Sequence, residues 1–162
     1  MITFSAGEIF KMAQDIEADG ARFYRKAAEH AAGQDCRGVL RRLADMEEEH
    51  EQAFIAMSSE LTARDKEMEG YDPDGEAAMY LRAMVEGKVF SPAAGAAAKL
   101  TGKETADEIL RTAVELEKDS ILFYLGMKDM VTSRSGKKTL EKIIGEEMDH
   151  ISTLCKEMES RG

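Results

Sequence analysis

The chain has 162 residues, of which 43% are hydrophobic and 33% are charged, and its formal net charge is −10. This length suffices for one domain with a hydrophobic core and is short for two. The acidic balance makes nucleic acid and anionic membranes unfavourable partners, because both attract basic patches. Ala, Glu, Leu, Lys and Met are frequent and only two prolines occur, so we predict a single all-α domain over residues 1–162.

The first predicted element is a helical hairpin. Ser5 and Glu8 have the spacing of a capping box, in which a hydroxyl and a carboxylate satisfy free backbone N–H groups at a helix start. Apolar residues then recur every three to four positions up to Gly33, which is expected to end the first helix. A second helix is predicted from about Asp35 to Arg64. Only a tight turn separates the two helices, so they should lie antiparallel.

The next segment, residues 65–103, is predicted to be a crossover connection, because it is too long for a hairpin turn. Glycines, a proline and aspartates indicate a loop over residues 70–75. A short helix is expected over residues 76–86, and Ser91-Pro92 has the pattern of a further helical start.

A second helical hairpin is predicted over residues 104–160. Thr105 and Glu108 form another capping box. The helix that they open is expected to reach about Val131, and the last helix to follow a turn and cover residues 137–159.

The two hairpins are copies of each other, because adding 100 to the residue number aligns one with the other. The shift pairs the capping boxes, and it pairs Phe-Tyr at residues 23–24 with Phe-Tyr at residues 123–124. The sequence therefore predicts a four-helix bundle made of two repeated hairpins, residues 5–64 and 104–160, that bury their apolar faces against each other.

A Glu-x-x-His motif occurs at the same place in each repeat, as Glu47 with His50 and as Glu147 with His150. Residues three apart on a helix lie on one face, so each motif offers a carboxylate and an imidazole to the same point in space. One such motif in a glutamate-rich helix arises easily by chance. Two motifs in matching register indicate a common site.

Helical geometry adds a further glutamate to each motif. At a rise of about 1.5 Å per residue, Glu17 and His50 both lie about 25 Å from the first turn, and Glu47 lies about 20 Å from it. These three residues are therefore level across the hairpin, and the repeat gives Glu117 the same place in the second one. Glu17 lies in an otherwise apolar stretch, where an unpaired carboxylate would be costly to bury.

Four glutamates directed into one core would repel one another, and a pair of divalent cations removes that repulsion. Carboxylates combined with imidazoles suit iron or manganese, whereas thiolates would favour zinc. The alternative interpretation is a solvated run of charges with two chance histidines, which the matching register disfavours. We interpret Cys36 and Cys155, the only cysteines, as free thiols and His30 as a surface residue.

This arrangement resembles the ferritin-like di-iron carboxylate proteins and, more closely, the rubrerythrin family. The resemblance rests on residues 16–24, residues 117–124 and the two Glu-x-x-His motifs, and it extends over nearly the whole chain, including residues 80–83. It implies a ferritin-like bundle with two iron ions per chain; manganese or zinc could replace iron in a purified sample. The metal ligands that it implies are Glu17, Glu47, His50, Glu117, Glu147 and His150. Glu47 and Glu147 are the implied bridging ligands.

Two tyrosines are candidates for a supporting role. Tyr24 and Tyr124 follow Glu17 and Glu117 by seven residues and so lie on the same helical faces. The functional interpretation is a phenol hydrogen-bonded to a ligand carboxylate, and the alternative is simple core packing. Four other acidic residues near the motifs are interpreted as surface residues or as outer partners of the ligands: Glu48, Glu49, Glu146 and Asp149.

The sequence departs from the family pattern in two respects. Rubrerythrins usually carry a rubredoxin-like domain with four cysteines that receives electrons, and this sequence has only two cysteines. Many also have a glutamate one helical turn after the ligand of the third helix, where this chain has Ser120. Electrons are therefore expected from an external donor protein such as a rubredoxin.

The resemblance implies a di-iron oxidoreductase of rubrerythrin type that reduces hydrogen peroxide or oxygen. The alternatives are a ferroxidase or iron-binding protein for iron storage or transfer, and a structural bundle with a vestigial site. A homodimer or higher homo-oligomer is expected. A cytoplasmic location is also expected, since the first ten residues lack the basic and apolar segments of a signal peptide.

Overall fold

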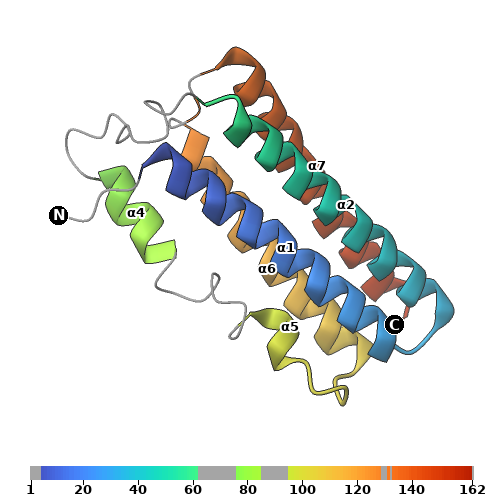
Figure 1. Cartoon of the computed structure of the whole chain (residues 1–162). Coiled ribbons are helices and arrows are strands. Elements are labelled where there is room, and N and C mark those ends of the chain that lie inside the picture. The colour runs from blue at the N-terminus through green and yellow to red at the C-terminus, as the bar shows by residue number, and fades with distance from the viewer. Residues whose placement is uncertain (1–4, 62–75, 85–94, 129–130, 132, 162) are drawn as a thin grey trace.

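The computed structural model describes residues 5–61, 76–84, 95–128, 131 and 133–161. Four long helices run side by side as a bundle (Figure 1), and they confirm the predicted all-α architecture. They are α1 (Ala6–His30), α2 (Gln34–Ser59), α6 (Ala106–Met127) and α7 (Arg134–Glu159). Two shorter helices belong to the predicted crossover: α4 (Glu76–Met84) and α5 (Ala96–Lys99).

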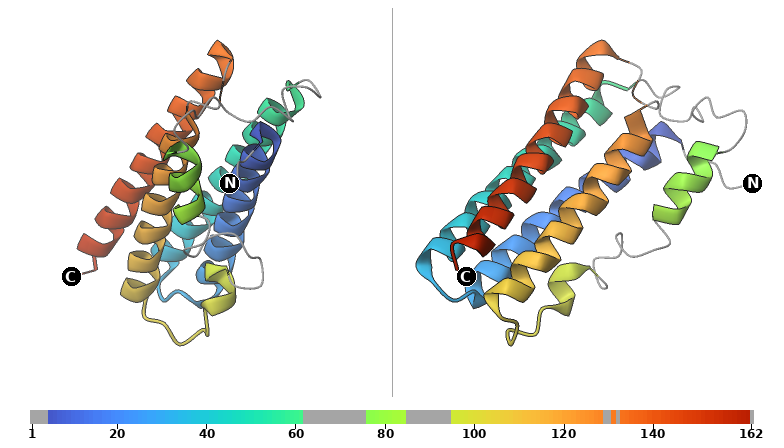
Figure 2. Two further views of the ribbon diagram at one scale, coloured as in Figure 1. Left: turned by 90° about the vertical axis from the view of Figure 1, so that its left-hand side faces the viewer. Right: turned by 180° about the vertical axis from the view of Figure 1, so that it is seen from behind.

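The bundle consists of two antiparallel hairpins, α1 with α2 and α6 with α7. They pack on each other through contacts of α1 with α6 and of α2 with α7. Figure 2 shows α4 and α5 on the same side of the bundle, where α5 contacts α1 and α4 contacts α6. The described parts of the crossover thus cover the layer formed by α1 and α6.

Both predicted capping boxes are confirmed. At the start of α1, the Ser5 N–H donates to the Glu8 carboxylate at 2.8 Å, and the Glu8 N–H donates to the Ser5 hydroxyl at 3.2 Å. Thr105 and Glu108 repeat the arrangement at the start of α6, with distances of 2.7 and 3.2 Å. The reciprocal bonds satisfy N–H groups that have no partner within the helix.

Two predicted helix ends are wrong in the first hairpin. α1 ends at His30, before Gly33, whose positive φ of 91° places it in the turn that leads into α2. α2 ends at Ser59 and not near Arg64. The Ser59 hydroxyl donates to the carbonyl of Ala56 at 2.7 Å, a local bond that competes with helix continuation.

The second hairpin departs from prediction at its turn. α6 ends at Met127 and not at Val131. The N–H of Val131, which is buried in the core, donates to the carbonyl of Lys128 at 3.4 Å, a bond of the tighter 3₁₀ kind. α7 begins at Arg134, earlier than the predicted Lys137, because the Ser133 hydroxyl accepts the N–H of Gly136 at 3.0 Å and caps the helix. α2 and α7 consequently have the same bounds after a shift of 100.

The crossover contains one element that was not predicted. α5 is held by Lys26 of α1, whose ammonium group donates to the carbonyls of Ala97 and Leu100 at 2.9 and 2.8 Å. The helix predicted over residues 76–86 is present as α4 up to Met84. The loop predicted over residues 70–75 and the helical start at Ser91-Pro92 lie outside the described residues.

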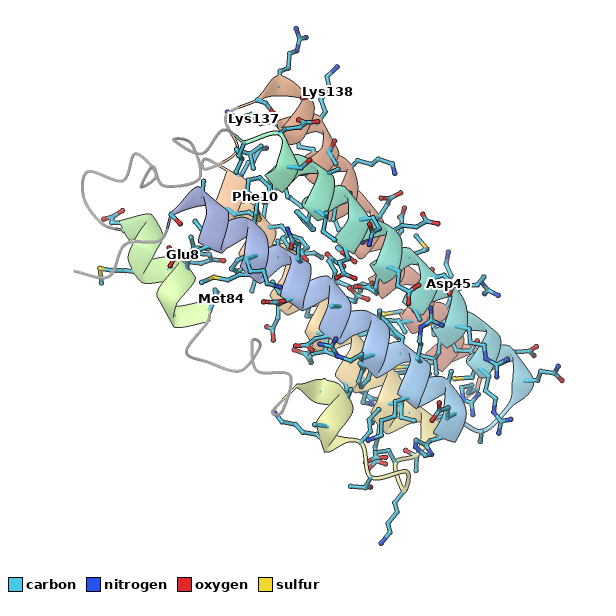
Figure 3. The ribbon with its side chains drawn as sticks, in the orientation of Figure 1. Glu8, Phe10, Asp45, Met84, Lys137 and Lys138 are labelled. Atoms are coloured by element: carbon cyan, nitrogen blue, oxygen red, sulfur yellow. The ribbon has the colours of Figure 1, made fainter. Side chains whose placement is uncertain are left out.

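The apolar core divides into two clusters along the bundle. One cluster includes Phe23, Leu40 and Ile109, and the other includes Phe54 and Leu140. Charged side chains such as Asp45, Lys137 and Lys138 lie on the outside of the helices (Figure 3). None of the helices that the structure describes combines the length and apolar character needed to cross a membrane. The space between the two clusters is where buried polar residues gather.

Candidate metal centre

Six buried acidic and imidazole side chains meet in the middle of the bundle. α1 and α6 contribute one glutamate each, and α2 and α7 contribute one Glu-x-x-His motif each. None is more than 4% exposed: Glu17, Glu47, His50, Glu117, Glu147 and His150. The structure thus brings together every residue that the resemblance implied as a ligand.

The six residues form two overlapping groups of four. Glu17 and His50 belong to the first group and Glu117 and His150 to the second, while Glu47 and Glu147 belong to both. Within each group, one ligand atom per residue lies within 4.8 Å of all the others. Two ligand atoms on opposite sides of one ion are about 4.2 Å apart, so each group has the dimensions of a single ion site.

Each imidazole faces carboxylates through Nδ1. His50 Nδ1 lies 3.0 Å from Glu147 Oε1 and 3.6 Å from Glu17 Oε2. His150 Nδ1 lies 2.9 to 3.3 Å from oxygens of Glu47, Glu117 and Glu147. The two rings are stacked with centroids 5.6 Å apart and an angle of 16° between their planes. The nitrogen lone pairs therefore converge on the same small volume as the carboxylates.

Burial and mutual repulsion disturb the protonation of these groups in the metal-free protein. Burial raises the pKa of Glu47 well above its usual range, and the charges of Glu117, Glu17 and Glu147 add to the rise. Burial also raises the pKa of Glu117 to about 7. For His150, burial lowers the pKa, but the close carboxylates of Glu117 and Glu147 outweigh it and raise the pKa to about 10. The centre favours cationic charge.

The unpaired atoms of the site fit a bound metal pair. Among the residues that the structure describes, Glu17 Oε2, Glu47 Oε1, Glu147 Oε2 and both ring nitrogens of His150 are buried without a hydrogen-bond partner. Each such atom costs about 1–3 kcal/mol if left unsatisfied. Coordination would use the lone pairs of these atoms, and the positive charge would offset the four carboxylates.

The two tyrosines cross between the hairpins. Tyr24 on α1 donates a hydrogen bond to Glu117 on α6, and Tyr124 on α6 donates one to Glu17 on α1. Burial raises the pKa of both phenols well above the usual value, and the charge of the bonded carboxylate raises it further. Both phenols therefore stay protonated and remain donors. The sequence had placed each tyrosine on the face of its own-helix glutamate, whereas the bonded partner lies on the other hairpin.

One outer contact makes the two halves unequal. His50 Nε2 lies 3.2 Å from Glu146 Oε2, and the other oxygen of Glu146 lies 3.0 Å from the Lys142 ammonium. In the repeat, Met46 is the residue that corresponds to Glu146, and Nε2 of His150 has no hydrogen-bond partner among the described residues. From the sequence alone, Glu146 was one of four acidic residues near the motifs whose role stayed open. Comparing positions 46 and 146 of the repeat would have singled it out.

The other acidic residues near the motifs lie outside the centre. Glu48 pairs with Arg25 at 2.6 Å on the surface, and Glu49 and Asp149 are exposed. His30 is exposed, in agreement with the sequence prediction. Both cysteines are free thiols; Cys36 is buried and Cys155 is partly buried.

Comparison with known proteins gives two matches. The sequence profile of the family described as Rubrerythrin matches residues 8–90. A crystal structure from Thermotoga maritima, provisionally described as a ferritin-like di-iron carboxylate protein, superimposes with a TM-score of 0.76 at 27% identity. That similarity covers 100% of this chain and 99% of the other, and it confirms the predicted ferritin-like bundle. No curated protein matches the sequence significantly.

Proposed function

Because this chain belongs to the rubrerythrin family, we propose that its six buried glutamates and histidines hold two iron ions and that the loaded protein reduces hydrogen peroxide. The observation that carries the proposal is the pair of overlapping four-residue groups that share Glu47 and Glu147. Each ion would receive one histidine, one terminal glutamate and the two shared carboxylates. A single ion in one group would leave the terminal glutamate and the histidine of the other group unused.

A bound ferrous pair would supply the two electrons that reduce the O–O bond of a peroxide. The chain's own residues prepare the site for this chemistry. The hydrogen bonds from Tyr24 and Tyr124 fix the orientation of Glu117 and Glu17. The contact of His50 Nε2 with Glu146 favours the tautomer that leaves the Nδ1 lone pair directed at the centre. The surrounding apolar clusters hold these side chains in place.

The function is tested by comparing two oxidants on identical anaerobic samples of ferrous-loaded protein. Hydrogen peroxide needs two electrons, which one ferrous pair holds, whereas oxygen needs four for complete reduction to water. We expect a larger second-order rate constant with peroxide, and one peroxide consumed for each ferrous pair. Stopped-flow absorbance and a titration of remaining ferrous iron measure both quantities.

The alternative is a ferroxidase that binds, oxidises and passes on iron. It is favoured by Ser120, a small buried residue at the position where many relatives carry a further glutamate. The same experiment separates the two functions. If oxygen reacts at least as fast as peroxide and ferric iron accumulates beyond the pair on repeated additions, the ferroxidase function replaces the peroxidase one.

The contact between His50 and Glu146 predicts unequal affinities for the two ions. Replacing Glu146 by alanine should lower the affinity for one ion by about tenfold or more and leave the affinity for the other nearly unchanged. The reason is that only His50 loses its outer partner. Anaerobic calorimetric titration with ferrous iron measures both affinities. Met46→Ala, at the matching position of the other hairpin, is the control and should change neither. If Glu146→Ala lowered the affinities for both ions equally, Glu146 would not act through His50 alone and the prediction would be wrong.

We also propose that electrons reach the centre from a separate donor protein such as a rubredoxin, and that the protein works in the cytoplasm as a homodimer or higher homo-oligomer. Exposed apolar side chains support a contact with another copy or with a donor. Met79 of α4 is 71% exposed, and Leu122 and Leu125 of α6 are 45% and 49% exposed.

A further inference from the structure

A cavity of about 440 Å³ lies beside the metal centre, between α1 and α6 and next to α5. The buried side chains of Tyr24, Glu47 and Glu117 form its inner end. Exposed Lys99 and Thr112 belong to its outer lining. The cavity therefore leads from the surface to two of the carboxylates proposed to hold metal.

This cavity is far larger than hydrogen peroxide requires. A water molecule occupies about 30 Å³, so hydrogen peroxide needs about 60 Å³. Cavities of about 300–1,000 Å³ are typical binding sites for organic molecules. The volume of about 440 Å³ falls within that range, so size alone favours a substrate with a hydrocarbon part.

The lining combines apolar side chains along the wall with small residues near the carboxylates of the inner end. Ile16, Leu100 and Leu116 supply apolar surface along the wall. Gly20 and Ser120 occupy matching repeat positions three residues after Glu17 and Glu117, and both line the cavity. A Cβ atom at Gly20 would come within 2.7 Å of Glu47 Oε2. Gly20 thus leaves room for the Glu47 carboxylate at the inner end of the cavity, and the small Ser120 side chain takes up little of the cavity beside Glu117.

Three acidic residues of the lining outside the metal centre, Asp19, Glu104 and Glu115, make polar contacts of their own. Asp19 accepts a hydrogen bond from Arg22 through Oδ1, while its buried Oδ2 has no hydrogen-bond partner among the described residues. Glu115 lies 2.7 Å from the Lys118 ammonium. Glu104 accepts two backbone N–H bonds at 2.8 and 2.9 Å. Because these charges already have partners, a neutral organic molecule suits the cavity better than a hydrated metal ion. An anionic substrate would meet the carboxylates of Glu47 and Glu117 at the inner end and four more acidic residues in the lining.

Building on the function proposed above, we propose that the cavity binds neutral organic hydroperoxides and that the centre reduces them to alcohols. The hydrocarbon part would lie against Ile16 and Leu116, with the hydroperoxide group directed at Glu47 and Glu117. The O–O bond of ROOH breaks, and ROH and one water molecule form. Two protons come from solvent, and two ferrous ions each give one electron and become ferric.

Binding is tested first, without metal or turnover. Cumyl alcohol, the product of cumene hydroperoxide reduction, should bind the metal-free protein and shift amide NMR signals of α5 and of the cavity side of α1 and α6. Ala96→Trp places an indole in the cavity and should abolish these shifts. Ala98→Trp, on the same short helix but exposed and not part of the cavity lining, should leave them unchanged.

Reduction is tested next on anaerobic, ferrous-loaded protein. Ala96→Trp should slow oxidation by cumene hydroperoxide by about tenfold or more while changing the rate with hydrogen peroxide by less than about twofold. Ala98→Trp should change neither rate. Thr112→Trp, at the exposed rim, is the second blocking variant should Ala96→Trp fail to fold.

The outcomes separate this inference from the function on which it rests. If cumyl alcohol does not bind, if it binds the blocking variants as well as wild type, or if those variants slow both oxidants equally, the cavity is not the hydroperoxide site. If wild type reacts with hydrogen peroxide but not with cumene hydroperoxide, this inference alone is wrong. If wild type reacts with neither oxidant, the proposed peroxidase function is wrong, and the proposed reduction of organic hydroperoxides is wrong as well.

Discussion

Replacing Glu147 by alanine should remove both metal ions from the protein, whereas Glu17→Ala should remove only one. Glu147 belongs to both four-residue groups and is fully buried, while Glu17 belongs to one group. After reconstitution with ferrous iron, wild type should contain about two ions per chain. Metal analysis should find almost none in Glu147→Ala and about one in Glu17→Ala.

The controls for this prediction are the two middle residues of the Glu-x-x-His motif of α2. Glu48 and Glu49 lie between Glu47 and His50 but are exposed, so Glu49→Ala and Glu48→Ala should keep the wild-type iron content. Far-UV circular dichroism establishes that each variant remains helical. Equal damage from Glu49→Ala and Glu147→Ala, or a wild-type protein that takes up no iron while folded, would refute the ligand assignment.

Removing the metal should leave a folded bundle whose stability falls as the pH rises. The two apolar clusters do not depend on the ions, unlike the cores of small zinc domains that unfold without metal. The pKa of Glu117 is about 7 when folded, against an ordinary value of 4.5. Between those values the folded protein holds a proton that the unfolded chain releases, so this contribution is present at low pH and lost as the pH passes 7.

His150 extends the same trend to higher pH. Its pKa is about 10 in the folded protein against an ordinary value of 6.5, so its contribution is complete below 6.5 and is lost as the pH approaches 10. Glu117 alone should account for about 3 kcal/mol of the decrease in the free energy of unfolding between pH 4.5 and 8.

Urea unfolding of the metal-free protein at a series of pH values measures this decrease. The Glu117→Gln variant has no titrating group at this position, so its free energy of unfolding should depend less on pH between 4.5 and 8. Iron-loaded wild type should lack the decrease, because the metal keeps the carboxylates ionised. A free energy of unfolding that stays constant or rises over this range would contradict the prediction. So would a cooperative loss of helix on chelation at neutral pH.

Features that belong to a single helix or to the repeat could be predicted from the sequence. Residues three apart share a helical face whatever the helix packs against, so Glu47 and His50 had to present their side chains together. Capping by Ser5 and Thr105 is equally local. The shift of 100 then predicted the same geometry for the second hairpin. The structure agrees, because the bounds of α2 and α7 differ by 100 at both ends.

Contacts between segments distant in sequence were decided only by the tertiary structure. Helical periodicity gives the face on which Tyr24 lies, but the packing of α1 on α6 makes Glu117 its partner. In the same way, the juxtaposition of α2 and α7 brings Glu146 to His50. The end of α6 before Val131, the position of α5 and the cavity beneath it depend on how side chains from several helices share one core. Such packing is a collective property that no local pattern encodes.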